Sequence, residues 1–324
     1  MKYKNNIKKL LVIIIILFLE LFLHHKYYYC IKCIKKYKKL PKCNECPTNI
    51  IFNGLRISSD KETLHQIINH KKSIGRYGDG EYKLIFGKKI RFQKFNQTLS
   101  NKLKEVLDNN DKDFLVGINL PYKILDKLTN HEIKFWKRYF MRYKFRINKL
   151  LNKKKKYYSA TITRFYYRYK DKSNAKNAIK TLKKIWEDKN ILIIEGDKSR
   201  IGIGNDLFKN AKSIKRIICP TENAFDVYDK IINIKNVLKL KEKRLILIAL
   251  GPTATVLAYD LYKLGYQSID FGHLDIEYEW FLRNTTQKIQ IKNKFVNEAE
   301  GKSHNFTKVK DKNYYKQIIA KILN

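Results

Sequence analysis

Several short runs in this chain are dominated by Ile, Leu and Val, with little alternation between apolar and polar positions. The clearest runs lie at 114–118, 190–195, 214–219 and 245–250, and a weaker one lies at 268–271. A strand has such a sequence when both faces of its sheet are covered. Stretches with helical periodicity separate the runs, at 175–187, 223–239 and 253–264. Because strands that alternate with helices usually pair in parallel, the pattern predicts a doubly wound α/β fold with a mostly parallel sheet.

The charge of the chain is extreme, with a formal net value of +39 over 324 residues. Such a balance usually indicates a nucleic-acid partner. Here the excess is mostly Lys and is spread over nearly every segment, so no single stripe marks a nucleic-acid surface, and nucleic acid is not the expected partner. The densest runs, at 32–42 and 153–156, are interpreted as solvated faces or as surfaces that favour anionic lipid head groups. The stretch at 122–157, rich in aromatic and basic residues, is predicted to be helical, with its aromatic side chains used for packing.

The N-terminus carries an apolar run at 10–23 that is interrupted only by Glu20. A helix of this length, rising about 1.5 Å per residue, is short for a hydrocarbon core of roughly 30 Å. The tyrosines at 27–29 extend it as an interfacial belt, so residues 1–29 are predicted to form a single-pass membrane anchor. A cleaved signal peptide is the alternative, although no small-residue cleavage site follows. The lysine distribution leaves both a cytoplasmic and a Golgi-lumenal catalytic domain open.

Four of the five cysteines lie in a basic stalk at 30–52, as Cys30-x-x-Cys33 and Cys43-x-x-Cys46. This pairing has the form of a structural Zn²⁺ knuckle, although the nine residues between the pairs are fewer than usual. Disulfides and palmitoylation are the alternatives. Cys219 ends an apolar run and is expected to be a buried core thiol. The catalytic domain is expected to occupy residues 53–324.

In a parallel α/β sheet, ligands bind at the carboxyl ends of the strands, so the turn after each run is where function is expected. The segment at 73–77 is followed by Gly78-Asp79-Gly80-Glu81. Glycine lets the backbone turn sharply and lets a diphosphate come close, and the two carboxylates are hard oxygen ligands for Mn²⁺ or Mg²⁺. A Gly-Asp-Gly turn without a functional role is the alternative interpretation of this pattern.

Two further turns have the character of anion sites. The run at 190–195 leads into Gly-Asp-Lys-Ser-Arg at 196–200, where Arg200 is a candidate phosphate clamp. The run at 245–250 leads into Gly-Pro-Thr at 251–253, at the start of a helix with free backbone donors. Because both turns follow strands of the same predicted sheet, together they are more specific than either is alone.

The last run is followed by Gly-His-Leu-Asp-Ile-Glu-Tyr-Glu-Trp at 272–280, which contains one imidazole and three carboxylates. On a helix, Asp275 and Glu279 share one face and His273 and Glu277 another. One of these groups is a candidate general base toward an acceptor hydroxyl. The alternative is a charged helix N-terminus, where acids favour the helix dipole.

Taken together, these motifs resemble the GT-D-type glycosyltransferases, once catalogued as a domain of unknown function. The resemblance opens with Ser73-Ile-Gly-Arg-Tyr-Gly-Asp-Gly-Glu81. It continues, in the order found in the family, through the blocks at 199–207, 219–225, 250–261 and 272–280. It covers roughly residues 60 to 285, and five separate blocks in order make chance an unlikely explanation.

The resemblance implies a Rossmann-like fold with an Asp-x-Glu metal motif, which here is Asp79 and Glu81. It implies a nucleotide-sugar donor, typically a UDP-sugar, that is bound through Mn²⁺ or Mg²⁺, and a glycan or glycoprotein acceptor. The general base is sought among His273, Glu277 and Glu279. The candidate donor contacts are Arg76, Arg200, Asn205, Asp206, Asn223, Gly251 and Thr253, of which Asn223 is equally a candidate helix cap. The alternatives are a non-catalytic nucleotide- or nucleic-acid-binding membrane protein and a hydrolase of nucleotide sugars.

Overall fold

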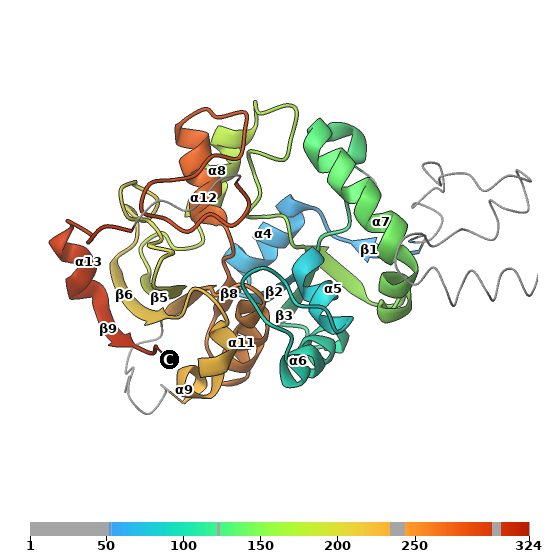
Figure 1. The fold of residues 1–324 in the computed structure, drawn as a ribbon, viewed down its shortest axis with the longest axis horizontal. Helices are drawn as coiled ribbons and strands as arrows, with labels where there is room; N and C mark the ends of the chain where they lie inside the picture. The colour runs from blue at the N-terminus through green and yellow to red at the C-terminus, as the bar shows by residue number, and fades with distance from the viewer. Residues whose placement is uncertain (1–51, 53, 122–123, 234–243, 300–305, 324) are drawn as a thin grey trace, which may run out of the picture. The chain divides into compact units, whose positions relative to one another are not determined.

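The computed structural model describes residues 52, 54–121, 124–233, 244–299 and 306–323 (Figure 1). The predicted anchor at 1–29 and nearly all of the predicted stalk, including its four cysteines, lie outside these residues. Within the described ranges, no helix is long and apolar enough to cross a membrane. The chain divides into two compact units, one holding residues up to 53 together with 130–150, and the other holding 54–129 together with 151–324.

The second unit contains a nine-stranded sheet, and all of its described strand pairings are parallel. The strands are β1 (Arg56–Ile57), β2 (Ser73–Tyr77), β3 (Phe114–Ile118), β4 (Lys156–Ser159), β5 (Asn190–Gly196), β6 (Ser213–Cys219), β7 (Leu245–Ala249), β8 (Ser268–Asp270) and β9 (Ile318–Lys321). Their order across the sheet is β1-β4-β3-β2-β8-β7-β5-β6-β9. The predicted parallel α/β fold is therefore confirmed, and all five predicted strands form.

The helices of this unit connect the strands. They are α4 (Asp60–Asn69), α5 (Asp79–Ile85), α6 (Gln97–Asp108), α8 (Ala175–Lys183), α9 (Tyr228–Ile232), α11 (Pro252–Lys263), α12 (Leu274–Leu282) and α13 (Lys312–Gln317), with short 3-10 turns η2 (Leu125–Lys127) and η3 (Ala224–Val227). Pro252 occupies the first turn of α11, as its sequence predicts. Of the helix expected at 223–239, η3 and α9 cover residues 224–232, and residues 234–239 lie outside the described ones.

Burial explains why the strand sequences are apolar throughout. All five positions of β3 are buried, as are four of the five in β7. Helix α11 packs closely on β2, where a side chain at Gly75 would lie 3.1 Å from the Thr255 carbonyl oxygen. Cys219 is fully buried, which confirms its expected place in the core. Packing of this density fixes the strand ends, and so the turns that follow them, in one arrangement.

Within the first unit, α7 (Asn130–Leu150) is described. It accounts for most of the stretch predicted to be helical at 122–157, although the end of that stretch forms β4 instead. One face of α7 is buried and largely aromatic, and Trp136, Tyr139 and Phe140 are in ring contact with one another. The expectation that these aromatics serve packing is confirmed.

The strand order reverses at two points, and the predicted functional turns flank both of them (Figure 1). From β5 the chain proceeds to β6 on one side, whereas from β7 it proceeds to β8 on the other. From β2 the chain proceeds to β3 on one side, whereas from β8 it proceeds to β9, which lies on the other side of the strand order. Ligands of open α/β sheets bind in the crevice outside the carboxyl ends of the strands at such reversals. The fold thus gathers the candidate site at the carboxyl ends of the strands.

Candidate active site

The turn after β2 places both predicted metal ligands in the first turn of α5. The Glu81 carboxylate accepts a hydrogen bond from the Gly78 N–H at 2.6 Å, which satisfies one of the free donors at the helix start. The Asp79 carboxylate is more than one-third exposed and pairs with Lys83 at 2.6 Å. Burial, followed by the neighbouring charge of Asp270, raises the pKa of Glu81 to about 7. This turn therefore brings two acids together, one paired with a lysine and the other buried at the start of α5.

Arg76, predicted as a donor contact, forms a buried ion pair that ties three elements together. Its guanidinium lies 3.0 Å from the Asp270 carboxylate at the end of β8 and donates to the Ala160 carbonyl oxygen, also at 3.0 Å, after β4. The Asp270 carboxylate also accepts from the Thr255 hydroxyl on α11 at 3.1 Å. A Cβ at Gly272, whose φ is +53°, would lie 1.9 Å from the guanidinium. Arg76 therefore supports the backbone beneath the site.

One face of α12 carries two acids, Asp275 and Glu279, that take part in a buried network of ion pairs and hydrogen bonds. Lys294, which is only 5% exposed, lies 2.7 Å from the Asp275 carboxylate and 2.9 Å from that of Glu279. The Asn205 side-chain amide donates to both carboxylates, at 2.9 and 2.7 Å. Although burial alone would raise it, Lys294 and these hydrogen bonds hold the pKa of Glu279 below its ordinary value. The predicted pairing of Asp275 and Glu279 on one face is confirmed, and Asn205 is fixed by it.

The other face of α12 carries His273 and Glu277. The Glu277 carboxylate accepts from the backbone N–H groups of Tyr166 and Tyr167 at 3.3 and 3.0 Å, and burial raises its pKa. The His273 ring lies 3.8 Å from the Glu298 carboxylate. Burial lowers the pKa of His273 to about 4, so the imidazole is neutral at neutral pH. Glu277 thus binds the backbone of the loop after β4, whereas the His273 ring nearby is uncharged at neutral pH.

The remaining predicted donor contacts lie around β5, β6 and β7. The Arg200 guanidinium faces the Phe306 ring at 5.4 Å, with the Arg200 backbone at φ +50°. The Asp206 carboxylate accepts from the Tyr278 hydroxyl and pairs with Lys183 at 2.9 Å, and these partners lower its pKa. These contacts connect Asp206 to α8 through Lys183 and to α12 through Tyr278.

Asn223 and Gly251 are both contacted by the loop between α5 and α6, which the sequence did not indicate as part of the site. Asn223 does not cap its helix; its side-chain oxygen accepts from the Lys94 N–H at 2.7 Å instead, and its own N–H donates to the Phe92 carbonyl oxygen at 2.8 Å. The Phe92 ring covers Gly251, where a Cβ would lie 2.5 Å from it. Thr253 is fully buried behind this turn. The loop between α5 and α6 therefore lies against the β6 and β7 turns.

Sequence reasoning also missed Asp270, Lys294 and Glu298. Asp270 did carry a signal, because a lone carboxylate at the end of a buried strand needs a partner and points to the functional edge. Lys294 and Glu298 carried none, since each is one charged residue among many in a highly charged chain.

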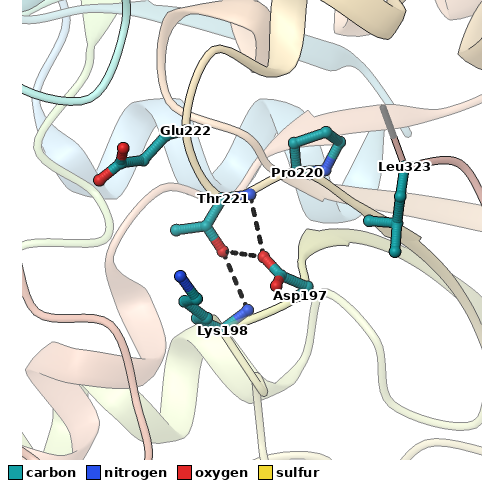
Figure 2. A pocket seen from close by; sticks show the side chains of 6 residues that line it. All are labelled: Asp197, Lys198, Pro220, Thr221, Glu222 and Leu323. Carbon is teal, nitrogen blue, oxygen red and sulfur yellow. Dashed lines mark hydrogen bonds between the residues drawn. The ribbon is translucent and has the colours of Figure 1, made fainter. Parts of the chain in front are cut away.

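A pocket of about 210 Å³ opens at the carboxyl ends of β5 and β6, lined by Asp197, Lys198, Pro220, Thr221, Glu222 and Leu323 (Figure 2). The Thr221 hydroxyl donates to the Asp197 carboxylate at 2.6 Å and accepts from the Lys198 N–H at 2.9 Å. A side chain at Gly196 would lie 2.7 Å from that hydroxyl, so the glycine permits the close turn. The pocket walls thus come from three strand ends that pack tightly together.

A parallel α/β sheet whose polar and glycine-rich turns meet at the carboxyl edge defines a Rossmann-like enzyme domain. Residues 74–299 match the family described as glycosyltransferase GT-D fold. The chain therefore belongs to this family, and the resemblance drawn from the five sequence blocks is confirmed.

Two curated relatives are similar over most of the chain. The glycosyltransferase GlyD of Streptococcus pneumoniae is 38% identical over 287 residues, which cover 86% of this chain and 34% of the relative. The probable glycosyl transferase Gly of Streptococcus gordonii is 36% identical over 276 residues, which cover 83% of this chain and 39% of the relative. The chain therefore spans between about one-third and two-fifths of the length of these relatives.

Two solved structures share the fold. A domain of unknown function 1792, described as highly conserved and as having a distinct glycosyltransferase fold, superposes with a TM-score of 0.79 at 35% identity, covering 87% of this chain and all of that one. A new glycosyltransferase of the same domain class from Streptococcus sanguinis gives 0.76 at 34% identity, covering 83% and 99%. The alternative of a non-catalytic binding protein is not favoured by these similarities.

Proposed function

We propose that this chain transfers a sugar from a nucleotide-sugar donor, a UDP-sugar, to a glycan or glycoprotein acceptor with the help of Mn²⁺ or Mg²⁺. The observation that carries the proposal is the position of Asp79 and Glu81, directly after β2, where the strand order reverses next to β8. A sheet of this kind presents its ligand site at that edge. Two carboxylates there would repel a diphosphate unless a cation lay between them.

The chemistry of the two carboxylates fits a divalent cation. The Asp79 side chain is more than one-third exposed, and the Glu81 carboxylate is two residues away in the same helical turn. The described residues contain no group of three or more His, Cys, Asp or Glu side chains that could hold a metal. Mg²⁺ is commonly held by one or two carboxylates together with substrate phosphates and water, so two protein ligands suffice. Bound there, the cation would offset the charge on the leaving diphosphate.

The other residues of the edge are assigned by their contacts. Arg200 and the backbone donors at the start of α11 would supply positive potential to the phosphates. Glu277 and Glu279 are committed to backbone amides and to Lys294, so we assign them to positioning. His273 lies at the start of α12, and its ring is assigned to accepting the proton of the acceptor hydroxyl, although its lowered pKa makes it a weaker base than a free imidazole.

The test is release of UDP from a panel of UDP-sugars by the detergent-solubilised full chain, with Mn²⁺ and with chelator. The informative variants are Asp79→Asn and Glu81→Gln, and Asp111→Asn is the matched control because Asp111 is exposed. We expect release from one sugar, lost with chelator and reduced at least a hundredfold in both informative variants, while the control stays active.

The outcomes separate the alternatives. Release that an added acceptor does not accelerate would indicate hydrolysis of the donor instead of transfer. Release that is unchanged by chelator and by both variants would overturn the assignment of Asp79 and Glu81. A folded protein that neither binds nor turns over any nucleotide sugar would overturn the proposed donor class.

A further inference from the structure

We propose that the pocket at the ends of β5 and β6 holds the nucleoside part of the donor; this inference rests on the proposed function. The pocket combines apolar walls with hydrogen-bond acceptors (Figure 2). Pro220 and Leu323 supply the apolar surface, and Leu323 is 46% exposed although it is a large aliphatic residue. Asp197 and Glu222 supply carboxylates at the other side of the pocket.

Asp197 is held so that one carboxylate oxygen is left for a ligand. Its Oδ1 accepts from the backbone N–H of Thr221 at 3.1 Å and from the Thr221 hydroxyl at 2.6 Å. Its Oδ2 has no hydrogen-bond partner among the described residues. An oriented carboxylate with one free oxygen recognises a donor group, such as a ribose hydroxyl or the N–H of a nucleobase.

The lining has a net negative charge, which favours the nucleoside over the phosphates of the donor in this pocket. Two carboxylates and one cation, Lys198, line it. The Asp79–Glu81 turn lies three strands away, in the order β2-β8-β7-β5, and therefore at roughly 14 Å. A nucleoside in the pocket would thus direct its diphosphate along the edge past the β7 turn toward those carboxylates.

Binding of two ligands to the folded full chain tests this assignment. UDP carries the nucleoside, whereas inorganic pyrophosphate carries only the phosphates, and both are titrated calorimetrically with Mn²⁺ present. We expect Asp197→Asn and Glu222→Gln each to weaken UDP binding, by roughly tenfold for Asp197→Asn, because a charge-assisted hydrogen bond is lost. Pyrophosphate binding is expected to stay the same. Glu187→Gln, on an exposed residue outside the pocket, is the control.

The two ligands keep the outcomes distinct. Equal UDP affinity in wild type, Asp197→Asn and Glu222→Gln would overturn the pocket assignment while leaving the donor class intact. Equal losses of UDP and pyrophosphate binding would also overturn it, because the pocket would then act on the phosphates. Failure of wild type to bind UDP at all would overturn the proposed function itself. Glu222 is exposed, so its variant tests the pocket even if Asp197→Asn fails to fold.

A second inference comes independently from α7, whose exposed face is a row of cations. Arg138, Arg142 and Arg146 are exposed and follow one another at intervals of four residues, so they lie along one side of the helix. Lys134, Lys137 and Lys149 are also exposed, and the helix contains a single acid, Glu132. We call the six exposed cations the α7 stripe.

The composition of the chain does not account for the arginines of this stripe. The chain contains 57 Lys and 12 Arg, so its positive charge comes overwhelmingly from lysine. Three of those 12 arginines nevertheless stand in register on one helix face. Arginine differs from lysine in its planar fork, which binds phosphate oxygens bidentately.

We infer that the α7 stripe lies on a membrane surface that contains anionic phospholipid. The three arginines span eight residues and so about 12 Å of helix, presented in a line along one side. Side chains at intervals of four residues lie on a row slightly inclined to the helix axis, so the three guanidinium groups can face one flat layer of phosphate head groups. Lysine and arginine side chains near an anionic leaflet are attracted to its negative surface potential.

Co-sedimentation of the full chain with vesicles of phosphatidylcholine, with and without one-third phosphatidylserine, tests this surface. Arg138→Glu, Arg142→Glu and Arg146→Glu are combined in one variant. Lys176→Glu, Lys180→Glu and Lys184→Glu form the matched control, because these lysines are exposed at the same spacing along α8 and just beyond its end. We expect the arginine variant to lose roughly a hundredfold in partitioning to the anionic vesicles, and the control at most a few-fold.

Equal losses in the two variants would overturn the inference, because the effect would then be one of net charge. So would anionic-vesicle binding that is the same in wild type and the arginine variant. If duplex DNA competed with the vesicles and its binding were lost in the arginine variant alone, the stripe would be a nucleic-acid surface instead.

Discussion

The candidate site contains several buried charged groups, and at the scale of the residue each is defined by the partner that it has. Glu279 has Lys294 and Asn205, Glu277 has two backbone amides, and Arg76 has Asp270. A buried charge without such a partner would shift its pKa or destabilise the fold. Most of the acids at the carboxyl ends of the strands therefore stabilise the structure, and the proposed function assigns the chemistry to Asp79, Glu81 and His273.

The lowered pKa of His273 predicts a dependence of stability on pH. The group facing it that favours the charged form is Glu298, and Arg164, Arg76 and Lys288 oppose that form. The unfolded chain binds a proton near pH 6.5, whereas the folded protein binds it near pH 4. The contribution of His273 to the free energy of unfolding is therefore fully present above pH 6.5 and is lost as the pH falls toward 4.

We expect wild type to lose at most about 3 kcal/mol relative to His273→Gln between pH 7 and pH 4, as measured by urea unfolding. His70→Gln, on an exposed residue, should parallel wild type. If the difference between wild type and His273→Gln stayed constant over this range, the imidazole would not be protected from protonation in the folded state.

Gly272→Ala should damage the site through one added carbon atom. The residue has φ +53°, and its Cβ would meet the Arg76 guanidinium, which is itself fixed by Asp270. We expect a loss of about 3 kcal/mol or more in the free energy of unfolding, from backbone strain and overpacking together. Gly87→Ala has the same backbone strain, at φ +76°, but nothing lies within 4 Å of its Cβ. Its loss should be about 1 kcal/mol, and equal losses in the two variants would argue against the steric explanation.

Residues that follow a predicted strand could be found from the sequence, and this explains which site residues were predictable. Arg200 and His273 lie in turns that follow predicted strands, and Asp79 follows the segment at 73–77, at a position where function is expected. Phe92, Lys294 and Glu298 come from connections whose path is set by tertiary packing. The partners of the predicted acids, and so their positioning roles, were therefore invisible in the sequence.

At the scale of the element, the long buried strands were predicted and the short edge strands were not. Runs such as those of β3, β5 and β7 are apolar because neighbours cover both of their faces. By contrast, β1 has two residues and β9 alternates between exposed and half-buried positions at the edge of the sheet. Strands of this kind lack a continuous apolar run, because edge strands bury less surface.

Helix α12 depends on the segment after it, which Lys294 connects to the helix. Lys294→Met removes the cation that bridges Asp275 and Glu279, so that buried Asp275 keeps only hydrogen-bond donors and Glu279 keeps Arg283 as its single cation. We expect a loss of about 3–5 kcal/mol in the free energy of unfolding. Chemical denaturation monitored by circular dichroism measures it, and Lys292→Met, an exposed lysine two residues away, is the control. Its effect should stay within about 0.5 kcal/mol, and an equally mild Lys294→Met would show that the network contributes little.

The sheet as a whole is assembled from strands that are far apart in the sequence. β1 pairs with β4 across about one hundred residues, and β6 pairs with β9 across a similar distance. The sheet is therefore complete only when the last residues of the chain are in place. The sequence predicted the central strands, whereas it did not predict that the C-terminal residues close the edge beside β6.

Removal of α13 and β9 should therefore affect the entire domain. β9 pairs with β6, and the Gln317 side chain accepts from Arg216 at 2.7 Å. Arg216 in turn forms a fully buried ion pair with Glu195, only 1% and 0% exposed respectively. A chain that ends at Lys310 would leave the backbone hydrogen-bonding groups of β6 unpaired on that side and would expose the Arg216–Glu195 pair to water. An exposed, apolar edge strand of this kind promotes aggregation.

We expect the chain ending at residue 310 to be largely insoluble or to melt well below wild type, as measured by the soluble fraction and by thermal unfolding. A chain ending at Lys321 keeps α13 and β9 and lacks only the last three residues, so it should remain folded. Near-wild-type stability of the shorter chain would mean that β9 is dispensable to the sheet. Loss of folding in both chains would place the stabilising contribution in residues 322–324, where the Ile322 N–H donates to the Ile218 carbonyl oxygen at 2.7 Å.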